Sequence, residues 1–114
     1  MSGVGLTTIA FPAGNTVTAG SEVTADLSFS DTNGNAITPD SAAYFIYDDT
    51  NATALSAWIT LSPLAPTVPV LIDPTYQTIT TGHLVESRLM IVRVMTGGQQ
   101  REDSAAYWVL AAPP

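Results

Sequence analysis

Residues 22–30 read EVTADLSFS, and this stretch decides the class of fold. Its apolar side chains alternate with polar ones and are those of Val23, Ala25, Leu27 and Phe29. An alternation of period two predicts a β-strand that packs on one side, because successive side chains of a strand point to opposite faces. An Asn-Gly pair follows at residues 33–34 and favours a tight turn, since both residue types tolerate positive φ angles.

Further strands are predicted before, within and after the segment Pro63–Pro74. Aromatic and β-branched residues predict them at 42–48, 56–61, 70–72 and 76–80. The four prolines at 63, 66, 69 and 74 indicate an edge strand or an extended loop, because proline cannot donate a ladder hydrogen bond. We therefore expect an all-β protein, an immunoglobulin-like antiparallel β-sandwich of about seven strands. It occupies residues 15–114, and residues 1–14 form an N-terminal arm or a first edge strand.

A long hairpin is predicted between residues 84–95 and 100–110, around the tip Thr96-Gly97-Gly98-Gln99. Gly-Gly suits a two-residue loop, which fixes the register of the two strands. Arg93 then lies opposite Glu102, and Met90 lies opposite Ala105.

This hairpin carries apolar residues on both faces, although a two-layer sandwich buries only one face of each sheet. One face has Met90, Val92, Val94, Ala105, Tyr107 and Val109, and the other has Leu89, Ile91, Ala106, Trp108 and Leu110. Either the arm or the proline-rich segment covers the outward strip, or the strip binds a partner. The interface candidates are Leu89, Ile91, Trp108, Leu110 and the arm residue Phe11.

The chain has 114 residues with ten Asp and Glu, three Arg, no Lys and no Cys. A net charge of −7 argues against a nucleic-acid partner and against an anionic membrane surface. The sequence has no stretch of about 18 apolar residues, so it predicts no transmembrane helix. The first 14 residues do not resemble a signal peptide, so we expect synthesis in a cytoplasm. Sparse charge favours an oligomer or an assembly.

Residues that suggest catalysis or metal binding have simpler interpretations. His83 is the only His and is interpreted as a solvated loop residue. Asp48-Asp49 and Asp73 are interpreted as surface charges, because an acid–base pair needs a shielded carboxyl. Asp31-x-Asn-x-Asn35 resembles a calcium loop, but its Gly comes fourth instead of sixth, so a turn explains it. We expect no enzyme activity, no cofactor and no metal; a loose calcium site and a small enzyme are the alternatives.

Two segments resemble the small immunoglobulin-like structural proteins of tailed bacteriophages. They are FSDTNGNAITPDSAAYFIYDD at 29–49, and the hairpin 86–110 with its Gly-Gly tip and YWV ending. Together they cover under half of the chain. The resemblance implies a virion component assembled in the host cytoplasm, with the major capsid protein and the sister subunits of a dimer or trimer as partners.

The resulting hypothesis is a capsid decoration, or cement, protein that binds the capsid lattice non-covalently. A head–tail or tail component is the close variant. The rival hypothesis is a carbohydrate- or cell-surface-binding module, for which Tyr47-Asp48-Asp49 is the nearest candidate site.

Overall fold

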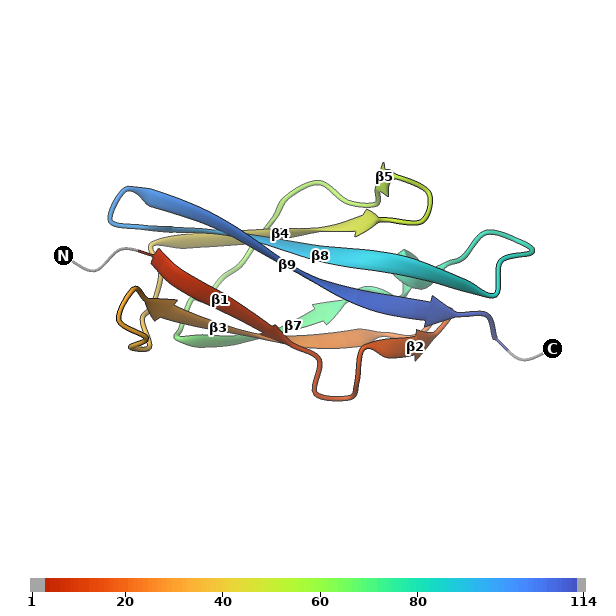
Figure 1. The fold of residues 1–114 in the computed structure, drawn as a ribbon, viewed down its shortest axis with the longest axis horizontal. Coiled ribbons are helices and arrows are strands. Elements are labelled where there is room, and N and C mark those ends of the chain that lie inside the picture. Colours follow the sequence, from red (N-terminus) through yellow and green to blue (C-terminus); the bar gives the residue numbers. More distant parts are fainter. Residues whose placement is uncertain (1–3, 113–114) are drawn as a thin grey trace.

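The computed structural model describes residues 4–112, and Figure 1 shows two β-sheets packed face to face. The smaller sheet has the strand order β1-β3-β7. Its strands are β1 (Val4–Ala10), β3 (Val23–Asp31) and β7 (Thr67–Ile72). The larger sheet has the order β2-β9-β8-β4-β5, and β6 also pairs with β4. Its strands are β2 (Thr16–Thr18), β4 (Ser41–Asp48), β5 (Thr53–Ala54), β6 (Ile59–Thr60), β8 (Val85–Thr96) and β9 (Gln99–Leu110).

This architecture confirms the predicted all-β, immunoglobulin-like sandwich. The two sheets separate β3 and β7 from β4, β8 and β9, as the B and E strands are separated from C, F and G in immunoglobulin domains. Within residues 4–112 seven strands have three or more residues, and β5 and β6 have two each. One strand pair departs from the antiparallel prediction, because β2 runs parallel to β9.

The core lies between the sheets and follows the alternation seen in the sequence. Along β3 the predicted apolar residues are buried, and the polar residues between them face outward. The other buried apolar side chains come from both sheets and are Ala42, Tyr44, Ile46, Val68, Val70, Ile72, Met90, Val92, Val94, Tyr107 and Val109. These residues form one contiguous cluster.

The β8–β9 hairpin has the predicted register. Arg93 pairs with Glu102, Val92 with Asp103 and Met90 with Ala105. Gly97 and Gly98 have φ angles of 57° and 79°, as a two-residue loop of this kind requires. The Gly97 N–H also donates to the Asp40 carboxylate over 2.9 Å, which ties the tip to the start of β4.

Two predicted strands are wrong in type or extent. Residues 76–80, predicted as a strand, begin inside a short 3-10 helix, η1 (Pro74–Gln77). Residues 78–80 then continue without strand pairing. Asp73 caps this helix by accepting from the Thr75 N–H over 2.9 Å, and Pro74 occupies its first turn, where no N–H is needed. The predicted strand at 56–61 shortens to β6.

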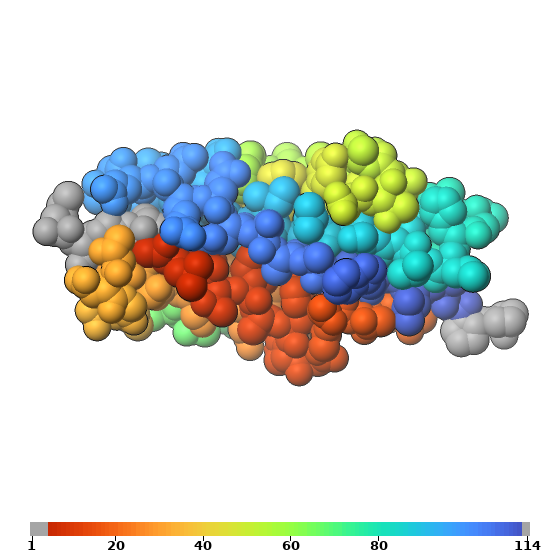
Figure 2. All heavy atoms as spheres, in the orientation of Figure 1, coloured from red at the N-terminus to blue at the C-terminus, as the bar shows by residue number. Residues whose placement is uncertain are grey.

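The N-terminal segment is the edge strand β1 and does not lie over the outward strip of the hairpin. It pairs with β3, and Figure 2 shows it beside β9 on one side of the sandwich. The Thr7 N–H donates to the Asp103 carboxylate over 3.1 Å, which joins the two sheets along this seam. On the opposite side, β6 and β7 leave a largely apolar pocket of about 470 Å³. Met1, Ser2 and Gly3 of the predicted arm lie outside the described residues.

Candidate interaction surface and a buried charge network

The alternation along β8 and β9 decides which face of the hairpin is core. Met90, Val92 and Val94 are buried between the sheets, so their neighbours point away from the smaller sheet. We call this outward side of the larger sheet the outer face. It is formed by the outward side chains of Ala43, Phe45, Tyr47, Val85, Ser87, Leu89, Ile91, Arg93, Glu102, Ser104, Ala106, Trp108 and Leu110.

Four of the five predicted interface residues lie together on the outer face. Trp108 and Leu110 are each 41% exposed, whereas Leu89 and Ile91 are half-buried between neighbouring strands. Val85, which sequence reasoning missed, pairs with Leu110 and is 48% exposed. The alternation along β8 could have identified it, because every odd-numbered residue of this strand points outward when Met90 is buried.

Phe11 is the fifth predicted interface residue, and the structure places it elsewhere. It lies between β1 and β2 and packs against the core. Its ring lies 5.7 Å from the ring of the buried Tyr107, at a tilted angle of 55°. Phe11 therefore shields the edge of the core, away from the outer face.

Trp58 covers one end of the outer face. Its ring meets Phe45 edge to face, with centroids 4.7 Å apart, and the Arg93 guanidinium lies 4.1 Å from the Trp58 ring centroid. Arg93 also pairs with Glu102 over 3.0 Å. Trp58, which precedes the proline-rich segment, thus covers part of the strip, and the end that carries Trp108 and Leu110 stays open.

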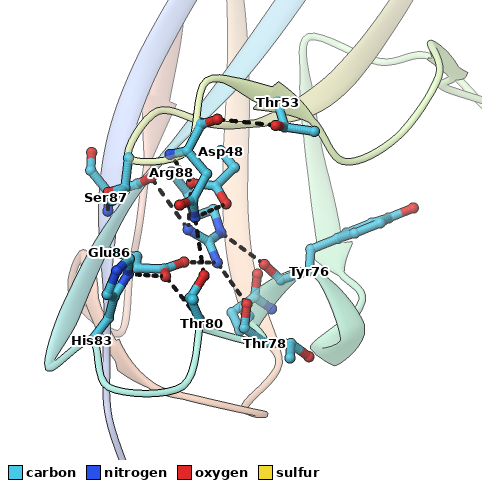
Figure 3. A network of polar contacts seen from close by, with 12 residues as sticks. Asp48, Thr53, Tyr76, Thr78, Thr80, His83, Glu86, Ser87 and Arg88 are labelled. Carbon is cyan, nitrogen blue, oxygen red and sulfur yellow. Dashed lines mark hydrogen bonds and ion pairs between the residues drawn. The ribbon is translucent and has the colours of Figure 1, made fainter.

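Beneath this open end, a buried charge network surrounds Arg88 (Figure 3). Its guanidinium pairs with Asp48 over 3.0 Å and with Glu86 over 2.9 Å. It also donates to the backbone carbonyls of Tyr76 and Thr78, over 3.0 and 2.8 Å. A buried Arg of this kind is stable only when its donors have acceptors, which these groups supply.

Glu86 is fully buried and stays ionised in this network. Burial by itself would raise the pKa of Glu86, but hydrogen bonds from the Thr80 N–H, Arg88 and His83 outweigh it and lower the pKa to about 2. His83 Nδ1 lies 2.6 Å from the second carboxylate oxygen. The interpretation of His83 as a solvated loop residue is therefore wrong in part, because its ring is half-exposed but bound to a buried acid.

The interpretation of Asp48 as a surface charge is also wrong. Its carboxylate is buried against Arg88 and accepts from the Asn51 side chain over 2.7 Å. Asp73 is exposed as predicted and acts as a cap. The Asp31 carboxylate accepts from the N–H groups of Asn33 and Asn35, each over 2.9 Å, so the predicted turn is confirmed.

A second polar group joins the core to the helix η1. The Tyr107 hydroxyl donates to the Gln77 side chain over 2.7 Å, and Gln77 donates in turn to the carbonyls of Ser21 and Asp73. Burial raises the pKa of Tyr107 far above its usual range, which keeps the hydroxyl protonated. These contacts position η1 and the strand β9 and bring no pair of reactive groups together.

Within residues 4–112, no three acidic or His side chains are placed to share a metal ion. The same residues include no helix with the length and hydropathy of a membrane span. Comparison with family models, with curated proteins and with solved structures finds no match for this chain. The outer face is the candidate functional site that the geometry offers.

Proposed function

We propose that this chain is a virion structural protein of tailed bacteriophages, and specifically a capsid decoration protein. The observation that supports this most is the open end of the outer face, where Trp108, Leu110 and Val85 are exposed together. Contiguous apolar patches on a soluble domain mark surfaces that bind another protein. The proposed partners are the major capsid protein and sister subunits, met during assembly in the host cytoplasm.

The proposed mechanism is non-covalent and needs no catalytic residue. Each subunit buries apolar strand faces against its partners, so every contact stabilises the assembled lattice by mass action. The sandwich suits this role because its core is contiguous without any disulfide. The hydrogen bond from Gly97 at the hairpin tip to Asp40 and the charge network around Arg88 both stabilise the sheet that presents the outer face.

The copy number of the chain in purified particles tests the proposal. Quantitative mass spectrometry should find hundreds of copies, comparable to the major capsid protein. About a dozen copies or fewer would move the chain to the head–tail junction or the tail, where rings have low symmetry. Complete absence from particles would overturn the virion proposal.

A variant links this role to the outer face. Trp108→Asp should abolish attachment to particles, because it places a charge in the apolar contact, while the isolated domain keeps its far-UV circular dichroism. Leu71→Asp is the matched control, since Leu71 is 61% exposed on β7, away from the outer face. Equal loss of attachment by both variants would contradict the assignment.

The carbohydrate-binding hypothesis has less support in the geometry. Of its nearest candidate site, Tyr47-Asp48-Asp49, the Asp48 carboxylate is buried and engaged by Arg88 and Asn51. This carboxylate therefore does not point toward solvent, where a sugar would bind. Binding on a glycan array that Asp49→Ala abolishes would favour this hypothesis over the virion proposal.

A further inference from the structure

We propose that the outer face binds a second copy of this chain, so that the protein is a two-fold symmetric dimer packed through its larger sheets. This proposal rests on the proposed function, which assigns a binding role to the outer face. It adds the identity of the molecule that binds there. Three properties of the outer face support it, and they concern its charge, its shape and its area.

The charge of the chain is distributed in a way that permits self-association. Two copies that each carry a net charge of −7 repel one another. On the outer face, however, the only charged side chains are Arg93 and Glu102, which neutralise each other. Asp49 lies at its rim, next to Ser87, and other acids such as Asp26 and Asp73 lie on the smaller sheet or at η1. The outer face is therefore where two copies meet with the least repulsion.

The order of side-chain sizes along the outer face permits a self-complementary contact. Along β9 the outward side chains change from small ones, Ser104 and Ala106, to large ones, Trp108 and Leu110. A two-fold axis near Ala106 would place Trp108 of each copy over the small side chains of the other. An isologous contact requires this relation, in which one patch holds both the projection and its recess.

The area of the outer face is that of a small interface. The face follows β8 for the nine residues from Val85 to Arg93, about 30 Å at ~3.3 Å per residue. Its side chains come from the three neighbouring strands β9, β8 and β4, which at a spacing of ~4.8 Å make it about 14 Å wide. The footprint of about 400 Å² in projection is about half of the ~800 Å² of accessible surface that each partner buries in a stable complex, so we expect a dimer that forms only at high concentration.

Sedimentation equilibrium of the purified full chain, from about 1 to about 500 µM, tests the proposal. We expect a species of twice the 11.9 kDa chain mass at the upper concentrations. Trp108→Ser should weaken the dimer by about 30-fold or more, since Trp anchors at the centre of an interface dominate its energy. Leu71→Ser, the matched off-face control, should leave the dissociation constant unchanged.

A third variant tests the shape argument without removing any apolar surface. Ala106→Trp fills the proposed recess and should dissociate the dimer, with the thermal unfolding midpoint checked to show that the domain stays folded. A wild-type chain that is monomeric at every concentration would overturn the inference, and so would a dimer that none of the outer-face variants weakens.

The two proposals fail in different ways. A monomer present in hundreds of copies per particle would overturn the dimer and leave the virion role standing, with the capsid protein as the occupant of the outer face. A dimer that is absent from particles would support the present inference and overturn the virion role.

Discussion

Arg88 is the residue whose environment differs most from what its sequence neighbours indicate. Within residues 86–88 the chain reads ESR, which suggests an exposed strand end. The structure buries Glu86 and Arg88 completely and adds Asp48 from β4. Alternation places these side chains on the same face as Met90, but their polarity argues against burial. Only the partner 40 residues away, together with the carbonyls of η1 and the following turn, makes the burial favourable.

Replacing Arg88 should therefore be costly. Arg88→Leu leaves Asp48 and Glu86 buried without their cation, and we expect the free energy of unfolding to fall by about 3–5 kcal/mol. Urea denaturation measures this loss. Arg101→Leu is the control, because Arg101 is paired with Asp103 at the surface and such pairs contribute at most about 1 kcal/mol. Equal losses in the two variants would show that the network contributes little.

The same network predicts how stability depends on pH. The pKa of Glu86 is lowered from 4.5 to about 2 in the folded chain. A lowered pKa gives a contribution that is complete above the unfolded value and is lost as the pH falls from about 4.5 through about 2. Urea denaturation at pH 5, 4, 3 and 2 should show this decline. Glu86→Gln should be less stable at neutral pH and show a flatter acid profile, and parallel profiles would contradict the assignment.

At the scale of elements, the hairpin was predictable in detail and η1 was not. A two-residue Gly-Gly loop leaves a single register for β8 and β9, so local sequence determined every pairing. The strand predicted at 76–80 contains Tyr and β-branched residues that favour β structure. The cap at Asp73 and the buried contacts of Gln77 with Ser21 and Tyr107 decide otherwise. Such contacts join distant segments, so no local pattern reveals them.

The hairpin tip offers a test of its own. Gly98→Ala places a Cβ where φ is 79°, with no atom within 4 Å, so only backbone strain changes. We expect a loss of about 1–2 kcal/mol in the free energy of unfolding, the cost of a left-handed conformation for an L-residue. Gln99→Ala, the next residue along, should change it by less than about 0.5 kcal/mol. A tip that tolerates Gly98→Ala as well as Gln99→Ala would argue for a different turn.

At the scale of the whole molecule, the candidate site was predictable as a set of side chains but not as a surface. Period-two alternation identified two apolar faces in the hairpin, and the burial of Met90 and Tyr107 selects the core face. The sequence did not reveal that Trp58 covers one end of the outer face through Phe45 and Arg93. It also left the place of Phe11 open, since that depends on how β1 and β2 divide between the sheets.

Phe11 marks the point where the chain crosses from the smaller sheet to the larger one. Because its ring packs on Tyr107, Phe11→Ala should lower the free energy of unfolding by about 2 kcal/mol or more. Leu6→Ala, on the preceding strand β1 and 48% exposed, is the control and should cost less. Thermal and urea unfolding measure both. If Phe11→Ala left stability intact and weakened self-association, Phe11 would belong to the interface after all.

The placement of the three arginines has a practical consequence for proteolysis. The sequence has no lysine, so trypsin can cut only after Arg88, Arg93 and Arg101. All three lie in paired strands of the larger sheet, and Arg88 is buried in the central strand β8. A strand held between two neighbours does not enter a protease cleft, so cleavage after Arg88 and Arg93, which lie between β4 and β9, waits for the sheet to open. The rate of tryptic cleavage at these two sites should therefore report unfolding of the domain and should slow further wherever a partner covers this sheet.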